Sequence, residues 1–285
     1  MAILLALCSA LAYGVSDFVG GIASRRTSAW AIAVAGTSTS AVCTSLAALV
    51  VGTGASTGSM AWGAAAGLGG GLGTGFLYRG FAVGRMSVVA PVSAVGAAVV
   101  PVLAGVVTGE RPSLLVWIGV VVAMPGIWLV SSAPEHPGSD MAPTGRWGVP
   151  EGLVDAVLAG LGFGLLFAAL GQVPHSAGLW PLAASQLVAV PTVVLTATLL
   201  RGQWVPRGRR PIGLAALSGA LGASATGTFL LATQHGFLTV AGVLASLYPA
   251  TTVLLAALLL RERVHRSQGI GLGLCALAIG LVAGG

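Results

Sequence analysis

Charge is the first thing that this sequence lacks. Only 7% of its 285 residues are charged and 56% are hydrophobic, whereas a soluble domain carries about 25% charged residues. So few charges cannot cover the surface of a water-soluble protein of this length. The composition therefore excludes an ordinary cytosolic enzyme and a disordered protein. It predicts an integral membrane protein that is embedded in a lipid bilayer.

Lysine is absent, so all 13 basic residues are arginines. They stand at the ends of apolar runs and do not gather into one basic face. That distribution is typical of membrane-topology signals and not of nucleic-acid binding. Without a lysine the chain also cannot form a P-loop, so ATP is not expected to drive it. We predict no nucleic-acid partner and no cofactor.

Residues that bind metals or form disulfides are few and scattered. The three cysteines, Cys8, Cys43 and Cys275, each lie within an apolar stretch and show no metal-ligand spacing. The four histidines lie far apart, in connections or at the ends of apolar runs. We predict no metal site and no catalytic residue, so a membrane-embedded enzyme is the weakest of the alternatives.

Ten apolar segments make up most of the chain, each near the length of about 20 residues that a helix needs to cross a bilayer. Lipid offers no partner to an open sheet edge, so each segment is predicted to be a helix. A polar connection with four prolines, 133–150, separates a first half, 1–132, from a second half, 151–285. The expected spans are 2–23, 30–52, 60–79, 86–108, 113–132, 152–171, 179–200, 211–233, 238–260 and 267–284.

The two halves repeat one another when the second is shifted by 152 positions. Five helices in each half is an odd number, so the second half must be inverted relative to the first. Inverted repeats are typical of transporters that bind a substrate near the membrane midplane. The predicted fold is all-α, with ten transmembrane helices in two inverted five-helix repeats. The matching pairs are Gly67 and Gly219, Gly70 and Gly222, Thr74 and Thr226, Gly75 and Gly227, Glu110 and Glu262, and Arg111 and Arg263.

Two stretches carry a family resemblance. The first runs from Tyr78 to Pro91 and continues with Gly109-Glu110-Arg111-Pro112. The second contains Ala245-Ser246-Leu247-Tyr248-Pro249 and ends in Gln268-Gly269-Ile270-Gly271. They resemble the two repeats of the EamA branch of the drug/metabolite transporter superfamily. The resemblance implies a central cavity and secondary transport by alternating access, often the export of an amino acid, metabolite or drug across the inner or plasma membrane. A channel or a lipid flippase on the same scaffold is the alternative.

Asp17 is the strongest candidate for a functional residue. It lies inside the first span, where a carboxylate costs about 2.5–3.5 kcal/mol near the membrane centre. Ser9, Tyr13 and Asp17 recur every four residues and form one polar stripe, which should face a wet cavity. We predict that Asp17 exchanges the proton that drives transport. The alternatives are that it reaches the membrane surface or pairs with Arg25 or Arg79.

Other polar side chains within the spans are expected to line the same cavity. Tyr248 lies mid-span beside Pro249 and should face it, whereas Tyr78 also fits an aromatic belt at the membrane surface. With so few charges in the spans, we expect a neutral, zwitterionic or lipophilic solute. The predicted binding set is Ser9, Tyr13, Asp17, Tyr78, Ser93, Gln186, Ser246 and Tyr248.

A second set of residues is expected to stabilise the fold and not to bind the solute. The chain is expected to act as a monomer or a homodimer. Glycines at four-residue spacing let helices approach closely. The Glu-Arg pairs after the fourth and ninth spans suggest local ion pairs or charges at helix N-termini, and Glu151 and Asp155 should cap the sixth helix. The structural set is Gly67, Gly71, Gly75, Gly219, Gly227, Glu110, Arg111, Glu262 and Arg263.

The arginines also predict the orientation of the chain. Twelve of the 13 lie in the odd-numbered connections, and only Arg111 lies in an even-numbered one. Because arginine-rich connections stay in the cytoplasm, both termini should lie outside, although proteins of the superfamily that the chain resembles usually keep them inside. A reporter that works only in the cytoplasm, fused after Gly285, should therefore be silent. Strong reporter activity would reverse the assignment.

Overall fold

The computed structural model describes residues 1–24, 27–52, 54–84, 86–131, 152–205, 208–259 and 265–284. Within these ranges the chain forms helices and no strand. The elements are α1 (Ala2–Ser24), α2 (Ala29–Val51), α3 (Thr57–Val83), α4 (Met86–Val107), α5 (Leu114–Ser131), α6 (Leu153–Leu170), the short 3-10 helix η1 (His175–Ala177), α7 (Trp180–Leu199), α8 (Arg209–His235), α9 (Leu238–Ala245), α10 (Tyr248–Leu259) and α11 (Arg266–Gly284).

Helices occupy all ten of the expected spans, with ends within a few residues of the predicted ones. Among the described residues, seven helices are long and apolar enough to cross a membrane. Two shorter apolar helices cover Val92–Val107 and Leu114–Val130. The long helix α3 is not among the seven, because its many glycines dilute its apolar content. The chain is a multi-pass helical membrane protein.

The ninth span differs from the prediction, because it is broken into α9 and α10 at Ser246 and Leu247. Pro249 explains the break, since it has no N–H to donate and its ring clashes with the carbonyl of the residue four positions earlier. That residue is Ala245, where α9 ends. The N–H of Leu247 donates instead to the carbonyl of Leu244 at 3.2 Å, which closes α9 with a tighter turn.

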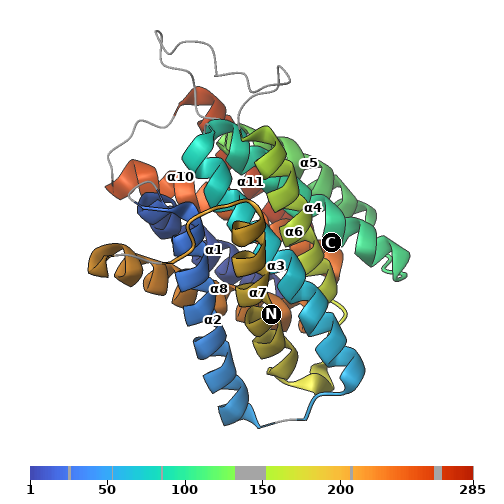
Figure 1. Ribbon diagram of the computed structural model, residues 1–285. Coiled ribbons are helices and arrows are strands. Elements are labelled where there is room, and N and C mark those ends of the chain that lie inside the picture. The colour runs from blue at the N-terminus through green and yellow to red at the C-terminus, as the bar shows by residue number, and fades with distance from the viewer. Residues whose placement is uncertain are drawn as a thin grey trace.

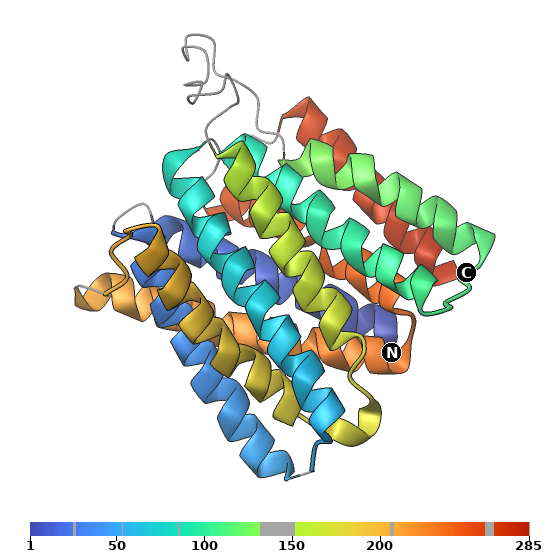
Figure 2. The same cartoon turned by 45° about the vertical axis from the view of Figure 1, so that its right-hand side comes forward.

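The first three helices of each half pack on those of the other half across the centre of the bundle. Helix α3 contacts α6 and α7, and α8 contacts α1 and α2. Helices α5 and α11 run side by side at one edge of the bundle, and α2 and α7 lie toward the opposite edge (Figures 1 and 2). The centre of the molecule is therefore built from α1, α2, α3, α6, α7 and α8.

Glycines make the closest of these contacts possible. A Cβ atom on Gly219 of α8 would lie 2.1 Å from the carbonyl oxygen of Gly36 in α2. A Cβ atom on Gly67 of α3 would lie 2.3 Å from the carbonyl oxygen of Ser185 in α7. No side chain fits at such distances, so the helix backbones touch one another directly.

The other glycines of the structural set serve packing in different ways. Gly71 also lies against the α7 backbone, because a Cβ atom there would be 2.8 Å from the carbonyl oxygen of Ala189. Gly75 instead receives the ring of Trp30, which would lie 2.7 Å from an added Cβ atom. Gly227 has room to spare, with only an ordinary contact to a leucine side chain.

The packing predicts opposite effects for two alanine substitutions on helix α8. Gly219→Ala should lower the free energy of unfolding by about 1–3 kcal/mol, because the backbone of α2 must move away. Gly213→Ala is the matched control, since nothing lies within 4 Å of an added Cβ atom there. It should leave stability unchanged or raise it by up to about 1 kcal/mol. Thermal unfolding of the purified variants in one detergent measures both, and equal losses would contradict this account of the contact.

Candidate functional site

The six central helices line a cavity with a volume of about 70 Å³. It has room for a few water molecules or a small ligand. Each of the six helices contributes to its wall, so both halves of the chain build it. The lining residues are Tyr13, Ser16, Asp17, Gly36, Thr37, Ser40, Gly70, Thr74, Leu77, Tyr78, Phe163, Leu166, Gln186, Ala189, Ser218, Gly219, Gly222 and Thr226.

Four residues of the predicted binding set line this cavity. They are Tyr13, Asp17, Tyr78 and Gln186. Gly219, expected to serve packing alone, lines it as well. The cavity brings together α1, α3 and α7, which the sequence places far apart. Tyr78 is only 4% exposed, so it belongs to this interior and not to an aromatic belt at the membrane surface.

The predicted set missed the small hydroxyl residues of the wall. Ser16, Thr37, Ser40 and Ser218 all line the cavity, but serine and threonine are common packing residues in membrane helices and nothing in the sequence singles these out. The internal repeat of the sequence does indicate four other lining residues. Gly70 and Thr74 line the cavity from α3, and the residues that match them in the repeat, Gly222 and Thr226, line it from α8.

Asp17 faces the cavity without a partner. It is partly buried on α1, and no hydrogen bond or ion pair joins it to another described residue. The alternative that it pairs with Arg79 is wrong, because Nη1 of Arg79 lies 3.2 Å from Oδ1 of Asp155 instead. Arg25, the other candidate partner, lies outside the described residues. The carboxylate of Asp17 is therefore available to whatever enters the cavity.

Tyr13 also presents an unsatisfied polar group at the cavity wall. Its side chain is 9% exposed, and its hydroxyl is buried without a hydrogen-bond partner. A buried polar group left unpaired costs about 1–3 kcal/mol. Tyr13 lies one helical turn from Asp17, so the two groups form a pair of adjacent unpaired polar sites on the same face of α1.

A hydrogen-bond network ties three helices together beside Asp17. Oγ of Ser16 donates to the carbonyl oxygen of Ser218 at 2.9 Å, and Oγ of Ser218 donates to the carbonyl oxygen of Ser16 at 3.0 Å. The hydroxyl of Tyr78 lies 3.1 Å from Oγ of Ser218. Oγ of Ser218 also lies 3.1 Å from Oγ of Ser16, so either hydroxyl can be the donor in the bond between Tyr78 and Ser218. Gly20 makes room for the phenol, since a Cβ atom there would lie 2.2 Å from the Tyr78 oxygen.

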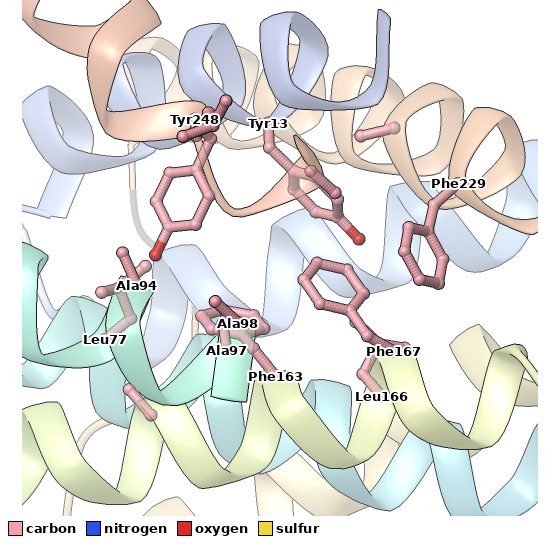
Figure 3. Close-up of a cluster of buried hydrophobic side chains, with 14 of the residues drawn as sticks. Tyr13, Leu77, Ala94, Ala97, Ala98, Phe163, Leu166, Phe167, Phe229 and Tyr248 are labelled. Carbon is pink, nitrogen blue, oxygen red and sulfur yellow. The ribbon is translucent and has the colours of Figure 1, made fainter. Parts of the chain in front are cut away.

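Aromatic rings pack directly beyond the cavity, toward the end of the bundle where α6 and α8 terminate. The ring centres of Tyr13 and Phe167 are 5.7 Å apart, and those of Phe167 and Phe229 are 4.4 Å apart. Figure 3 shows these rings meeting from α1, α6 and α8. We call Tyr13, Phe167 and Phe229 the aromatic cluster. Of these three residues, Tyr13 also lines the cavity.

Tyr248 lies behind the cavity wall and does not line it. Its ring centre is 6.4 Å from that of Tyr13, and its hydroxyl lies 3.5 Å from Oγ of Ser93 (Figure 3). Tyr248 is thus not a lining residue of this cavity, and its place in the binding set stays a prediction. The break before α10 turns the residue toward α4 and Tyr13.

Three predicted hydroxyl residues also lie outside the lining, because helix backbones take up their hydrogen bonds. Ser9 donates to the carbonyl oxygen of Ala225 in α8 at 2.8 Å. Ser93 and Ser246 donate to carbonyl oxygens of their own helices, at 3.1 and 2.8 Å. These residues act in helix packing, which was the alternative reading of such side chains.

Glu110 lies at a helix N-terminus, but that helix belongs to the other half. Its carboxylate accepts hydrogen bonds from the N–H groups of Leu238 and Thr239 and from Oγ1 of Thr239, the last at 2.6 Å. Arg111 donates to the backbone carbonyl of Glu110 at 3.2 Å and forms no ion pair with its carboxylate. Glu262, Arg263 and Glu151 lie outside the described residues.

The described residues hold no group of three or more His, Cys, Asp and Glu side chains that could bind a metal ion. The polar chemistry of the cavity is one carboxylate, one amide and several hydroxyls. Such a wall can bind a small solute by hydrogen bonds and charge, and it can hold a proton on Asp17.

Comparisons with known proteins give the context of this architecture. A model of the EamA-like transporter family matches residues 1–132 and 151–284. No curated protein gives a significant match. A solved crystal structure superposes with a TM-score of 0.74 over 99% of this chain and 96% of its own, at 18% identity. At that identity the likeness shows a shared fold alone.

Two tyrosine-to-phenylalanine substitutions should distinguish the Tyr78 hydroxyl, which has a hydrogen-bond partner, from the Tyr13 hydroxyl, which has none. Tyr78→Phe removes the bond to Ser218 and should lower the free energy of unfolding by about 1 kcal/mol. Tyr13→Phe removes a hydroxyl that has no partner, so stability should stay the same or rise. Unfolding of both variants in one detergent gives the comparison. A loss for Tyr13→Phe as large as that for Tyr78→Phe would mean that the Tyr13 hydroxyl has a structural partner.

Proposed function

The chain belongs to the EamA-like transporter family, and we propose that it is a secondary transporter that exports a small solute through the central cavity by alternating access. The observation that carries the proposal is the unpaired carboxylate of Asp17 in a cavity built by both halves. Members of this family are transporters and not enzymes. We place the chain in the inner or plasma membrane.

The proposal includes two inverted five-helix halves that move against one another. The pairing of the helices supports this, because α3 packs on α6 and α7 just as α8 packs on α1 and α2. Such an exchange of partners is what a two-fold relation between the halves produces. The matched positions Thr74 and Thr226 lie on the same cavity, which agrees with a binding site between two repeats.

Ring packing beside the cavity supports a transporter over a channel. The aromatic cluster packs between α1, α6 and α8. A solute that leaves the cavity on this side can pass only if the rings separate. Contacts such as those at Gly67 and Gly219, where no side chains interlock, allow helices to shift against one another.

Asp17 is the proposed site at which the transport cycle takes up and releases a proton. A carboxylate removed from water needs a proton or a cation to neutralise it. No described residue supplies the cation. A proton and a cationic or polar substrate can therefore occupy Asp17 in turn, which couples the movement of one to the movement of the other.

Asp17→Asn should abolish proton-driven accumulation while it permits passive exchange of a neutral solute. A resistance screen of overexpressing cells, against amino acids and toxic compounds, supplies the solute, and proteoliposomes with an imposed pH gradient give the measurement. Asp155→Asn is the matched control, because Asp155 pairs with Arg79 away from the cavity wall. It should keep the coupling if it folds.

Two results would contradict this proposal. Accumulation by Asp17→Asn at the rate of the natural chain would place the coupling elsewhere, with Glu151 next in line. Transport by the natural chain that does not respond to the pH gradient would remove proton coupling altogether.

A further inference from the structure

The charge of the cavity wall has one sign. Asp17 is the only charged side chain among the described lining residues, and no arginine or histidine is among them. The chain has no lysine at all. The nearest described arginine in sequence to the wall, Arg79, is held by Asp155. A ligand that enters the cavity therefore meets one negative charge and no described positive charge.

Four of the eight lining hydroxyls are acceptors toward the cavity. Once a hydroxyl donates its only hydrogen to a backbone carbonyl, its oxygen can only accept a hydrogen bond from a ligand. Tyr78 shares a further hydrogen bond with Ser218, in which either hydroxyl can be the donor. The lining hydroxyls that donate to carbonyls are Ser16, Thr37, Ser218 and Thr226, at 2.9, 2.8, 3.0 and 2.9 Å.

An acceptor-rich wall with one carboxylate matches the chemistry of a protonated amine. An ammonium group has up to three N–H donors and no acceptor, and it neutralises Asp17 on binding. Phe163 and Leu166 complete the wall with apolar surface for a hydrocarbon group.

The same wall disfavours an amino acid. A zwitterion would bring a carboxylate into a cavity that offers it no described cation and already contains one carboxylate. A desolvated charge without a partner is costly, and a like charge nearby adds to that cost. The amide of Gln186 and the hydroxyls of Ser40 and Thr74 can donate hydrogen bonds, but they supply no positive charge.

We propose that the cavity binds small organic amines that carry an apolar group and no carboxylate. The proposal rests on the proposed function, since it takes this cavity to be the transport site. It narrows the substrate class, because it removes the amino acids that the family resemblance implied.

Two matched sets of ligands test the proposal at two sizes. Isobutylamine, valine and isobutanol share one hydrocarbon group, and phenethylamine, phenylalanine and 2-phenylethanol share another. Binding of each to the purified full chain is measured by calorimetry and by the shift in thermal unfolding. At least one amine should bind more tightly than its amino acid and its alcohol by about tenfold or more.

Variants of Asp17 then test whether the amine binds in the cavity. Asp17→Asn should lose amine affinity by about tenfold or more, and Asp17→Glu should restore most of it. Asp155→Asn, the matched control, should bind the amine like the natural chain. Size-exclusion chromatography checks that each variant is folded.

Several outcomes would overturn the amine proposal. They are binding of an amino acid or an alcohol as tightly as the amine, binding of no ligand in either set, and amine binding that persists in folded Asp17→Asn. Amine binding that depends on Asp17, without amine accumulation in proteoliposomes, would instead contradict the proposed transport function and leave the ligand class standing.

Discussion

The structure depends on direct contact between helix backbones at the centre of the bundle. Gly219 against Gly36, and Gly67 against Ser185, bring α8 onto α2 and α3 onto α7 with no side chain between them. Lipid provides no hydrophobic drive for helices to associate, so such contacts must hold the helices by dispersion and shape. The cavity lies directly beside one of these contacts, since Gly36 and Gly219 also line it.

The described acidic side chains differ in the partners that they contact. Asp155 is neutralised by Arg79, and Glu110 is neutralised by the N-terminus of α9. Both carboxylates therefore connect segments of the first half to segments of the second. Asp17 has no such partner among the described residues, and that contrast separates the acid that we propose to be functional from the structural ones more clearly than depth in the membrane does.

Sequence patterns predicted the helices well, because the length of an apolar run and its polar ends determine a span. They also placed Tyr13 and Asp17 correctly on one face, since helical spacing alone decides that. They could not predict which hydroxyls line the cavity, because Ser9 and Ser16 look alike until α8 is in position. They could not predict that Glu110 reaches α9, a contact across 128 positions of chain. They could not place Tyr248 relative to the cavity either, because a proline shows that a helix breaks but not where the next residue then points.

The contact between Glu110 and α9 bears on how the chain is assembled and on how its gene could have arisen. Helix α9 begins after Phe237, whose side chain caps nothing, so its first N–H groups rely on a carboxylate from the other half. Synthesis proceeds from the N-terminus, and that carboxylate is therefore made before the helix that needs it. The second half is thus not self-sufficient. A gene fragment that encoded it alone would insert a helix whose leading amides lack this carboxylate, unless a separate copy of the first half were made alongside it.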